Sequence, residues 1–227
     1  MFKLDADPGG RSDPFMDAQQ LLQEVLAGRA PPLRQLTVGE VHRMFELGVL
    51  RDGEAVELIH GVLVRKDRAA TGDNTMIHGP RHAQAVMRLQ RLDERFRSHG
   101  FHLRTQLPVT LSDTEEPEPD AVMVRGELGA YETRHPGGSD VAVVVEVADS
   151  SLAYDRTTKL QLYAAHGIPT YAILNLRDDV VELHARPDVA SMRYLAREVL
   201  AVGDVWSIPI GADVITVEVA SLVPPRP

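Results

Sequence analysis

The spacing of apolar residues along the chain predicts a succession of helices and strands. Helical spacing is found over residues 13–28, 37–48, 80–99 and 153–166. Short apolar or alternating runs, typical of strands, are found over residues 101–111, 120–125, 140–148, 170–176, 180–185 and, in several pieces, 194–222. Two alternating runs over residues 54–66 flank His60-Gly61, which predicts a hairpin. The run at 140–148 is apolar on both faces, so we expect it at the centre of a sheet.

The length and composition indicate one globular domain with an N-terminal extension. The chain has 227 residues, of which 44% are hydrophobic and 25% charged, so extensive disorder is excluded. A hinge at Ala30-Pro31-Pro32 divides the sequence, and we expect an extension with one helix over 1–33 and a single domain over 34–227. The absence of cysteine excludes disulfides, cysteine-bound zinc, iron–sulfur clusters and a thiol nucleophile.

Charge and hydropathy limit the possible partners. The net charge of −9 argues against a protein that coats nucleic acid non-specifically, but it allows a local basic patch. The longest apolar run, Val141 to Val145, is far shorter than the roughly 20 residues of a membrane helix. The N-terminus lacks the basic start and the apolar stretch of a signal peptide. We therefore expect a soluble, cytoplasmic protein without a membrane partner.

The residues that point to chemistry are acids in strands that are otherwise apolar. Glu146 interrupts the central apolar run, Asp120 opens a strand directly after Pro119, and Glu57 lies within the predicted hairpin. A buried carboxylate is costly unless it is paired, hydrogen-bonded or bound to a metal ion. Two carboxylates at the ends of adjacent strands can share Mg²⁺, and Lys159 on the following helix supplies an ammonium group. Such a set is the minimum for phosphodiester hydrolysis.

Several short strings place the chain near a known family. They are ELIHG at 57–61, the His of RHAQ at 81–84, the Gln of TQLPVTL at 105–111, EPD at 118–120, VVVEVADSS at 143–151 and YDRTTKLQLYAAHGIPTYAIL at 154–174. Each string is weak alone, but their order and spacing are specific. Over residues 36–220 the chain resembles the Uma2 family, which consists of bacterial proteins described as endonucleases of the PD-(D/E)XK superfamily.

The resemblance implies a restriction-endonuclease-like fold of the α/β (α+β) class, with a mixed central sheet of about four or five strands flanked by helices. It also implies a metal site. The Pro-Asp of the motif falls on Pro119-Asp120 and its second acid on Glu146, so Asp120, Glu146 and the carbonyl of Val147 would hold Mg²⁺ or Mn²⁺. Where the motif has lysine this chain has Ala148, and catalytic Lys159 would serve in its place.

Further residues are assigned to catalysis or to nucleic acid. Glu57 matches an early acid of the family and would hold a second metal ion or orient the site. His82 and Gln106 match recurrent polar positions of the family, and we expect them at the nucleic acid. We also expect phosphate contacts from a basic stripe on the helix predicted at 80–99. The stripe consists of Arg88, Arg91 and Arg95.

The three best candidates for catalysis each have a purely structural alternative. Glu146 could form an ion pair in the core, and Asp120 could cap a turn after proline. Asp155 lies four residues before Lys159, which allows an ordinary pair on one helix face.

The other candidates have structural alternatives as well. Glu57, the basic stripe and the acidic run from Asp113 to Glu118 could simply face solvent. His82 could be a satisfied structural histidine. The spacing of the nine histidines argues against a histidine zinc site.

The leading interpretation is a metal-dependent endonuclease that hydrolyses phosphodiester bonds in DNA through a metal-activated water. Two alternatives stay open: a catalytically silent binding protein with the nuclease fold, which the acidic charge and Ala148 allow, and a nuclease acting on RNA, since no base-reading motif is present. Nucleases that cut both strands often act as dimers, so we expect a homodimer, although the sequence leaves the oligomeric state open.

Overall fold

The computed structural model describes residues 34–66, 79–210 and 213–226. The chain divides into two units, Met1–Gln35 and Leu36–Pro227, and the elements below belong to the second unit. The predicted helix over 13–28, and with it the predicted extension over 1–33, lies outside the described residues.

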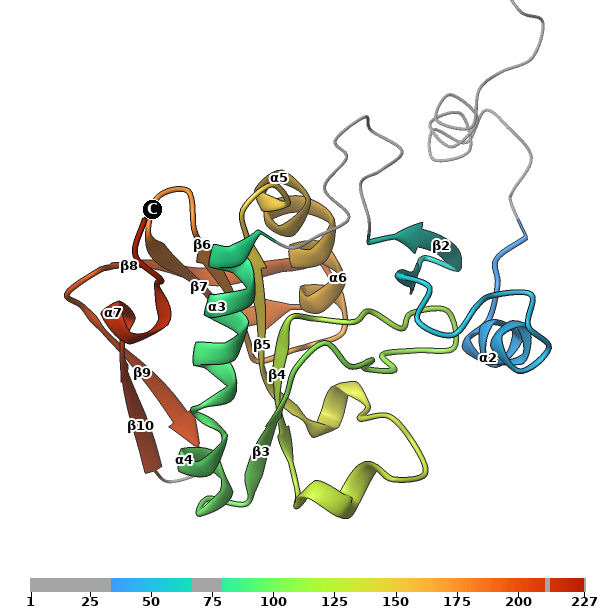
Figure 1. The fold of residues 1–227 in the computed structure, drawn as a ribbon, viewed down its shortest axis with the longest axis horizontal. Helices are drawn as coiled ribbons and strands as arrows, with labels where there is room; N and C mark the ends of the chain where they lie inside the picture. Colours follow the sequence, from blue (N-terminus) through green and yellow to red (C-terminus); the bar gives the residue numbers. More distant parts are fainter. Residues whose placement is uncertain (1–33, 67–78, 211–212, 227) are drawn as a thin grey trace, which may run out of the picture. The chain divides into compact units, whose positions relative to one another are not determined.

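A six-stranded mixed sheet forms the centre of the fold, in the order β3-β4-β5-β6-β7-β8 (Figure 1). Its strands are β3 (Phe101–Arg104), β4 (Ala121–Arg125), β5 (Val141–Ala148), β6 (Thr170–Asn175), β7 (Val180–Asp188) and β8 (Arg193–Ala201). β5 and β6 are parallel, and all other neighbouring strands are antiparallel. The mixed sheet flanked by helices confirms the predicted fold class. The sheet has six strands, more than the four or five that were expected, because β8 pairs along β7 and extends the sheet at that edge.

The two faces of the sheet carry different layers. One face is covered by α3 (Pro80–Gln90), α7 (Val219–Leu222) and the hairpin of β9 (Val205–Ile210) and β10 (Asp213–Glu218). The other face is covered by a helical segment made of α5 (Leu152–Tyr154), the π-helical turn η4 (Asp155–Lys159) and α6 (Leu160–Ala165). Because side chains alternate along a strand, Val145 and Val147 of β5 face α3, whereas Glu146 and Ala148 face the helical segment.

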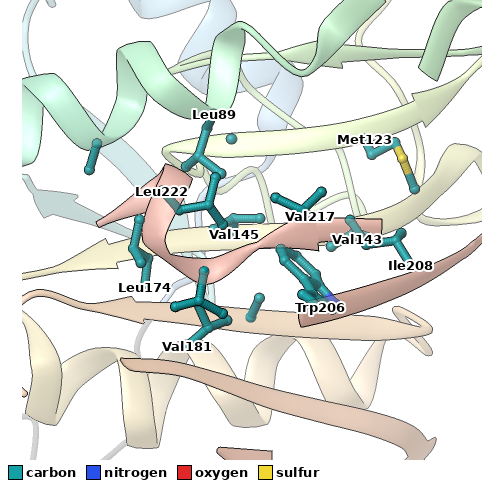
Figure 2. Close-up of a cluster of buried hydrophobic side chains, with 14 of the residues drawn as sticks. Leu89, Met123, Val143, Val145, Leu174, Val181, Trp206, Ile208, Val217 and Leu222 are labelled. Carbon is teal, nitrogen blue, oxygen red and sulfur yellow. The ribbon is translucent and has the colours of Figure 1, made fainter. Parts of the chain in front are cut away.

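The larger hydrophobic cluster holds α3 against the sheet. Leu89 of α3, Val145 of β5, Trp206 of β9 and Leu222 of α7 are all buried in it (Figure 2). Full burial of such a side chain contributes roughly 1.5–3 kcal/mol. The buried residues of α3 include His82, so the packing that fixes this helix also fixes the imidazole of His82.

The hairpin that carries Glu57 is supported by α2 (Val38–Glu46). This helix begins with the predicted capping box, in which the Glu40 N–H donates to Thr37 Oγ1 (3.2 Å) and the Thr37 N–H donates to Glu40 Oε2 (3.0 Å). The predicted hairpin is formed by β1 (Val56–Ile59) and β2 (Val62–Arg65), and its turn at His60-Gly61 has positive φ at both residues. A small cluster of Val41, Leu50 and Leu58 joins α2 to the hairpin.

Two predicted elements end earlier than the apolar spacing predicts. The helix expected over 80–99 is divided into α3 and α4 (Asp93–Arg97). The strand expected over 101–111 ends at Arg104, since Gln106 has a positive φ of 52° and Pro108 cannot donate to a strand ladder. The loop between β4 and β5 contains two short 3₁₀ turns, η2 (Leu128–Tyr131) and η3 (Gly138–Asp140). Within the described part of the chain, no helix has the length and the apolar character needed to cross a membrane.

A buried carboxylate on β7 gives the fold a specific sensitivity to acid. Glu182 accepts hydrogen bonds from Arg156 (3.1 Å), Asn175 (3.0 Å) and Arg197 (3.1 Å). Burial alone would raise the pKa of Glu182, but these hydrogen bonds outweigh burial and lower that pKa to about 2. Because the folded-state pKa is depressed, the stabilisation is complete above the ordinary value of 4.5 and is lost as the pH falls from there to about 2.

We therefore expect Glu182→Gln to lower the free energy of unfolding at pH 7 by about 1.5–3 kcal/mol, toward the lower end because both arginines are about half exposed. Urea unfolding of the wild type and the variant should show this difference shrinking between pH 5 and pH 3. A difference that is independent of pH would contradict the ion-pair explanation.

Candidate active site

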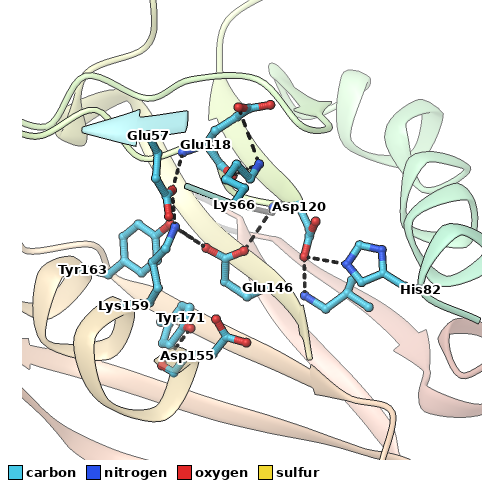
Figure 3. Close-up of polar contacts among 11 residues, drawn as sticks. Glu57, Lys66, His82, Glu118, Asp120, Glu146, Asp155, Lys159, Tyr163 and Tyr171 are labelled. Atoms are coloured by element: carbon cyan, nitrogen blue, oxygen red, sulfur yellow. Dashed lines mark hydrogen bonds and ion pairs between the residues drawn. The ribbon is translucent and has the colours of Figure 1, made fainter. Parts of the chain in front are cut away.

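Neighbouring strands bring Asp120 and Glu146 together. β4 and β5 are antiparallel with Ala121 opposite Val145, so Asp120, the residue before β4, lies beside Glu146. The Asp120 N–H donates to Glu146 Oε2 (3.3 Å), and the Val147 N–H donates to Asp120 Oδ2 (2.8 Å) (Figure 3). Asp120 and Glu146 are only 8% and 6% exposed. The spacing of 26 residues in the sequence thus becomes direct contact at the start of β4.

Lys159 lies between two of the buried acids. Its Nζ is 2.5 Å from Glu57 Oε2 and 3.2 Å from Glu146 Oε1, and all three side chains are at most 8% exposed. The ammonium therefore joins the hairpin to the central strand, and its ion-pair partners are Glu57 and Glu146. The alternative of a solvent-facing Glu57 is also wrong, because this residue is buried. We call Glu57, Asp120, Glu146 and Lys159 the acid–lysine cluster.

The helical segment explains how Lys159 can occupy the place of a lysine at position 148. Side chains at 146 and 148 leave β5 on the same face, and the helical segment packs on that face. Its π-helical turn, Asp155–Lys159, is wider than an α-helical turn and buries both of its end residues. Single π turns are rare and frequently lie at functional sites. The turn thus places the ammonium of Lys159 beside Glu146, while Ala148 belongs to the surrounding apolar cluster.

Three further side chains or backbone groups complete the surroundings of the cluster. The Tyr163 hydroxyl donates to Glu146 Oε1 (2.9 Å), and Tyr163 is fully buried. The Glu118 N–H donates to Glu57 Oε2 (3.2 Å), and Lys66 Nζ donates to the Glu118 carbonyl (2.9 Å). Every acid of the cluster is therefore held by at least one donor from another element.

The predicted nucleic-acid residues occupy different places. His82 Nε2 lies 3.2 Å from Asp120 Oδ2, so this buried imidazole contacts the acid–lysine cluster itself. Gln106 is exposed, and its backbone N–H donates to the carbonyls of Pro119 and Asp120, each at 3.2 Å. Its left-handed backbone thus closes the turn that leads into β4.

The basic stripe has structural partners at two of its three positions. The Arg88 guanidinium donates to the Val223 carbonyl (2.7 Å), and that of Arg95 donates to the Thr216 carbonyl (2.6 Å). Both side chains therefore contact the C-terminal segment, Arg88 from a half-buried position and Arg95 from an exposed one, and Arg91 is exposed as well. The alternative of a solvated stripe is wrong for Arg88 alone, and a role of the stripe in phosphate binding stays a prediction.

The electrostatics of the cluster show an excess of negative charge. Burial, together with the nearby acids, raises the pKa of Glu146 to about 7 even though Lys159 opposes the shift. Burial would lower the pKa of Lys159, but Glu146 and Glu57 outweigh it and raise that pKa. For Asp120, the hydrogen bond and the charge of His82 outweigh burial and lower the pKa. The Lys159 ammonium thus contacts two carboxylates, and Asp120 is paired with His82.

The donor set fits a hard divalent cation. Mg²⁺ and Mn²⁺ prefer carboxylate and carbonyl oxygens. Asp120, directly before β4, and Glu146 and the carbonyl of Val147 on β5 offer such oxygens, and a cation there would offset the charge that Lys159 leaves uncompensated. The residues present are therefore compatible with the metal that the family resemblance implies.

Comparison with known proteins gives a family and a fold. A family model described as "Uma2: Putative restriction endonuclease" matches residues 40–220, which is most of the chain. The chain belongs to the Uma2 family. This membership makes it a protein of a nuclease family and confirms the resemblance seen in its sequence motifs.

The fold of this Uma2 protein is also found in a solved structure. The crystal structure of "a putative nuclease belonging to DUF820" from Anabaena variabilis ATCC 29413 superposes with a TM-score of 0.58 and 15% sequence identity. The match covers 82% of the Uma2 chain and 97% of the other chain. At this identity the similarity supports the fold. A comparison with curated proteins gives no match.

Sequence reasoning missed Tyr163, which contacts the cluster of this Uma2 protein, and Lys66, which contacts Glu118 beside the cluster. Tyr163 follows Lys159 by four residues, so both lie on one helix face, and this spacing is a signal that could have identified Tyr163. Lys66 is one of only three lysines among 24 basic residues. The Glu118 carbonyl that Lys66 contacts belongs to the EPD string, but nothing in the sequence pairs these two residues.

Proposed function

We propose that this Uma2 protein is a metal-dependent endonuclease that cleaves DNA, with its catalytic domain over residues 34–227. One observation carries the proposal: buried carboxylates from β1, from β5 and from the residue before β4 converge with a lysine from η4. These elements are distant in sequence, and burial of so many charges is costly unless they serve a purpose. Perturbed ionisable groups of this kind are typical of active sites.

In this proposal Asp120, Glu146 and the Val147 carbonyl hold Mg²⁺ or Mn²⁺. The bound cation would acidify a water molecule and neutralise charge on the scissile phosphate. A second cation, or the orientation of the site, would depend on Glu57.

The protein's own side chains supply position and charge around the reacting groups. His82 holds Asp120 through its Nε2, and Tyr163 holds Glu146 through its hydroxyl. Lys159, itself held by Glu57, is the cation available to orient the attacking water or to contact a phosphate oxygen. The nucleic acid would also meet Gln106 and the exposed Arg91.

The contacts of Lys159 favour an enzyme over a catalytically silent binding protein. Such a protein was suggested by Ala148, which leaves the motif without its lysine. Lys159 supplies the missing ammonium at 3.2 Å from the second acid, so the set of groups is complete. We propose DNA as the substrate, with RNA as the alternative that the experiment below includes, and a homodimer as the form that cuts both strands.

A cleavage assay with the wild type and Asp120→Asn tests both the proposed site and the proposed substrate. The purified chain is incubated with supercoiled DNA and with structured RNA in Mg²⁺, in Mn²⁺ and in EDTA. We expect the wild type to cleave DNA only with metal, and the variant to be at least about 100-fold slower, since metal ions contribute several kcal/mol to such reactions. Equal rates for both proteins would refute the site, and cleavage of RNA alone would refute the substrate.

A further inference from the structure

A second group of possible metal ligands lies outside the acid–lysine cluster. His42 of α2, Glu116 of the segment before β4 and His135 of the loop before β5 each offer one ligand atom, and these atoms all lie within 4.8 Å of one another. His42 Nε2 is 2.6 Å from Glu116 Oε2, and the ring centroids of His42 and His135 are 5.9 Å apart. We propose that these three residues, the His–Glu–His cluster, bind a Zn²⁺ ion.

The donor chemistry selects Zn²⁺ over the hard cations of the proposed active site. Two imidazoles and one carboxylate are a common three-ligand set for Zn²⁺, with water in a fourth, tetrahedral position. Mg²⁺ prefers an all-oxygen set. Bond lengths of about 2.0–2.2 Å place tetrahedral ligand atoms roughly 3.3 Å apart, so rotation of the partly exposed His42 side chain would suffice to admit the ion.

The buried member of the cluster, Glu116, is already oriented. Glu116 is 8% exposed, and its Oε1 accepts a hydrogen bond from Thr110 Oγ1 (2.6 Å), which leaves Oε2 toward His42. A carboxylate held in this way by an outer partner is typical of metal ligands.

Glu115, the residue next to Glu116, forms a second histidine–glutamate pair, which serves as a control. His60 Nδ1 lies 2.7 Å from Glu115 Oε1, and the His60 N–H donates to Glu115 Oε2 (2.8 Å). This pair has the same chemistry and a similar separation as His42 and Glu116. Among the residues that the structure describes, however, only His42, Glu116 and His135 form a three-ligand group.

A bound Zn²⁺ would link α2 to two loops beside the hairpin. The Glu116 N–H donates to the Leu58 carbonyl (2.8 Å), and Leu58 follows Glu57 of the acid–lysine cluster. The ion would therefore stabilise the part of the fold that delivers Glu57. This consequence does not depend on whether the protein cleaves nucleic acid.

Zn²⁺ titration by calorimetry, with the full chain and excess Mg²⁺ present, tests the proposal. We expect one Zn²⁺ per wild-type chain and a higher melting temperature in its presence. His42→Ala, His135→Ala and Glu116→Gln should each weaken Zn²⁺ binding by at least about 100-fold, because loss of even an outer partner of a ligand costs 10–100-fold. His60→Ala, the matched control, should bind Zn²⁺ like the wild type and show the same rise in melting temperature.

The variants also define the contrary results. Glu116→Gln keeps the shape of the side chain and its hydrogen bond from Thr110, and circular dichroism of the metal-free variants checks that all of them fold. The proposal would be overturned if the wild type did not bind Zn²⁺, or if the three ligand variants bound it as tightly as the wild type. Binding that is lost in Asp120→Asn but retained in His135→Ala would place the ion at the acid–lysine cluster and would also overturn it.

Discussion

Lys159→Met should destabilise the protein by about 3–5 kcal/mol, the range expected when one partner of a buried ion pair is removed. The Lys159 ammonium contacts Glu57 (2.5 Å) and Glu146 (3.2 Å), and none of these side chains has appreciable access to water. Methionine fills much of the same volume but leaves two buried carboxylates without their cation. Urea unfolding at pH 7 measures the loss.

A double variant separates this electrostatic effect from a packing effect. Glu57→Gln combined with Lys159→Met removes one of the unpaired charges, so it should recover part of the stability that Lys159→Met loses. Lys66→Met serves as the matched control, because Lys66 is 20% exposed and its ammonium contacts Glu118, outside the acid–lysine cluster. We expect that control to cost less than about 1 kcal/mol. A loss below 1 kcal/mol for Lys159→Met as well would contradict the buried pair.

Glu146→Gln should abolish metal-dependent cleavage while the fold is retained. The amide has the shape of the carboxylate, and its oxygen can still accept a hydrogen bond from Tyr163 or from the Asp120 N–H. A neutral amide oxygen is a much weaker ligand of a hard cation than a carboxylate oxygen, because it lacks the negative charge. We expect the cleavage rate to fall by at least about 100- to 1000-fold, which corresponds to the loss of several kcal/mol of transition-state stabilisation.

Glu182→Gln is the matched control for this loss of activity. Glu182 is another buried glutamate in a neighbouring part of the sheet, and its partners are arginines and an asparagine outside the acid–lysine cluster. The Glu182→Gln variant should cleave like the wild type at pH 7, at temperatures below the lowered melting point of the variant. Circular dichroism of Glu146→Gln must show the wild-type spectrum for the comparison to apply, and cleavage by Glu146→Gln at the wild-type rate would exclude Glu146 as a metal ligand.

Residue type and spacing within short stretches of sequence were sufficient to predict much of the fold and to identify Asp120 and Glu146. The capping box at Thr37 and the hairpin turn at His60-Gly61 follow from residue type and spacing. An acid in an otherwise apolar strand signals a special environment, and the structure places Glu146 beside Asp120, where adjacent strands meet. These features depend on short stretches of sequence, which is why a single sequence reveals them.

The remaining features depend on contacts between distant segments. Apolar spacing predicts a helix over 153–166, but the π turn that brings Lys159 to Glu57 depends on packing against the sheet. The acidic run was expected to include a solvated loop, yet both Glu115 and Glu116 are buried. Glu115 contacts His60, which lies 55 residues away in the chain, and Glu116 contacts His42, which lies 74 residues away. No pattern within a window of sequence contains such separations.

Calorimetric titration with Mn²⁺ at low salt, comparing the wild type with Glu146→Gln, tests the central claim most directly. Zn²⁺ is left out, so the His–Glu–His cluster with its preference for Zn²⁺ contributes little. The account predicts Mn²⁺ binding by the wild type that is lost in Glu146→Gln, both with and without a short DNA duplex whose ends are blocked. Equal binding by the two proteins, or no binding by the wild type even when the duplex is present, would contradict a metal site at Asp120 and Glu146.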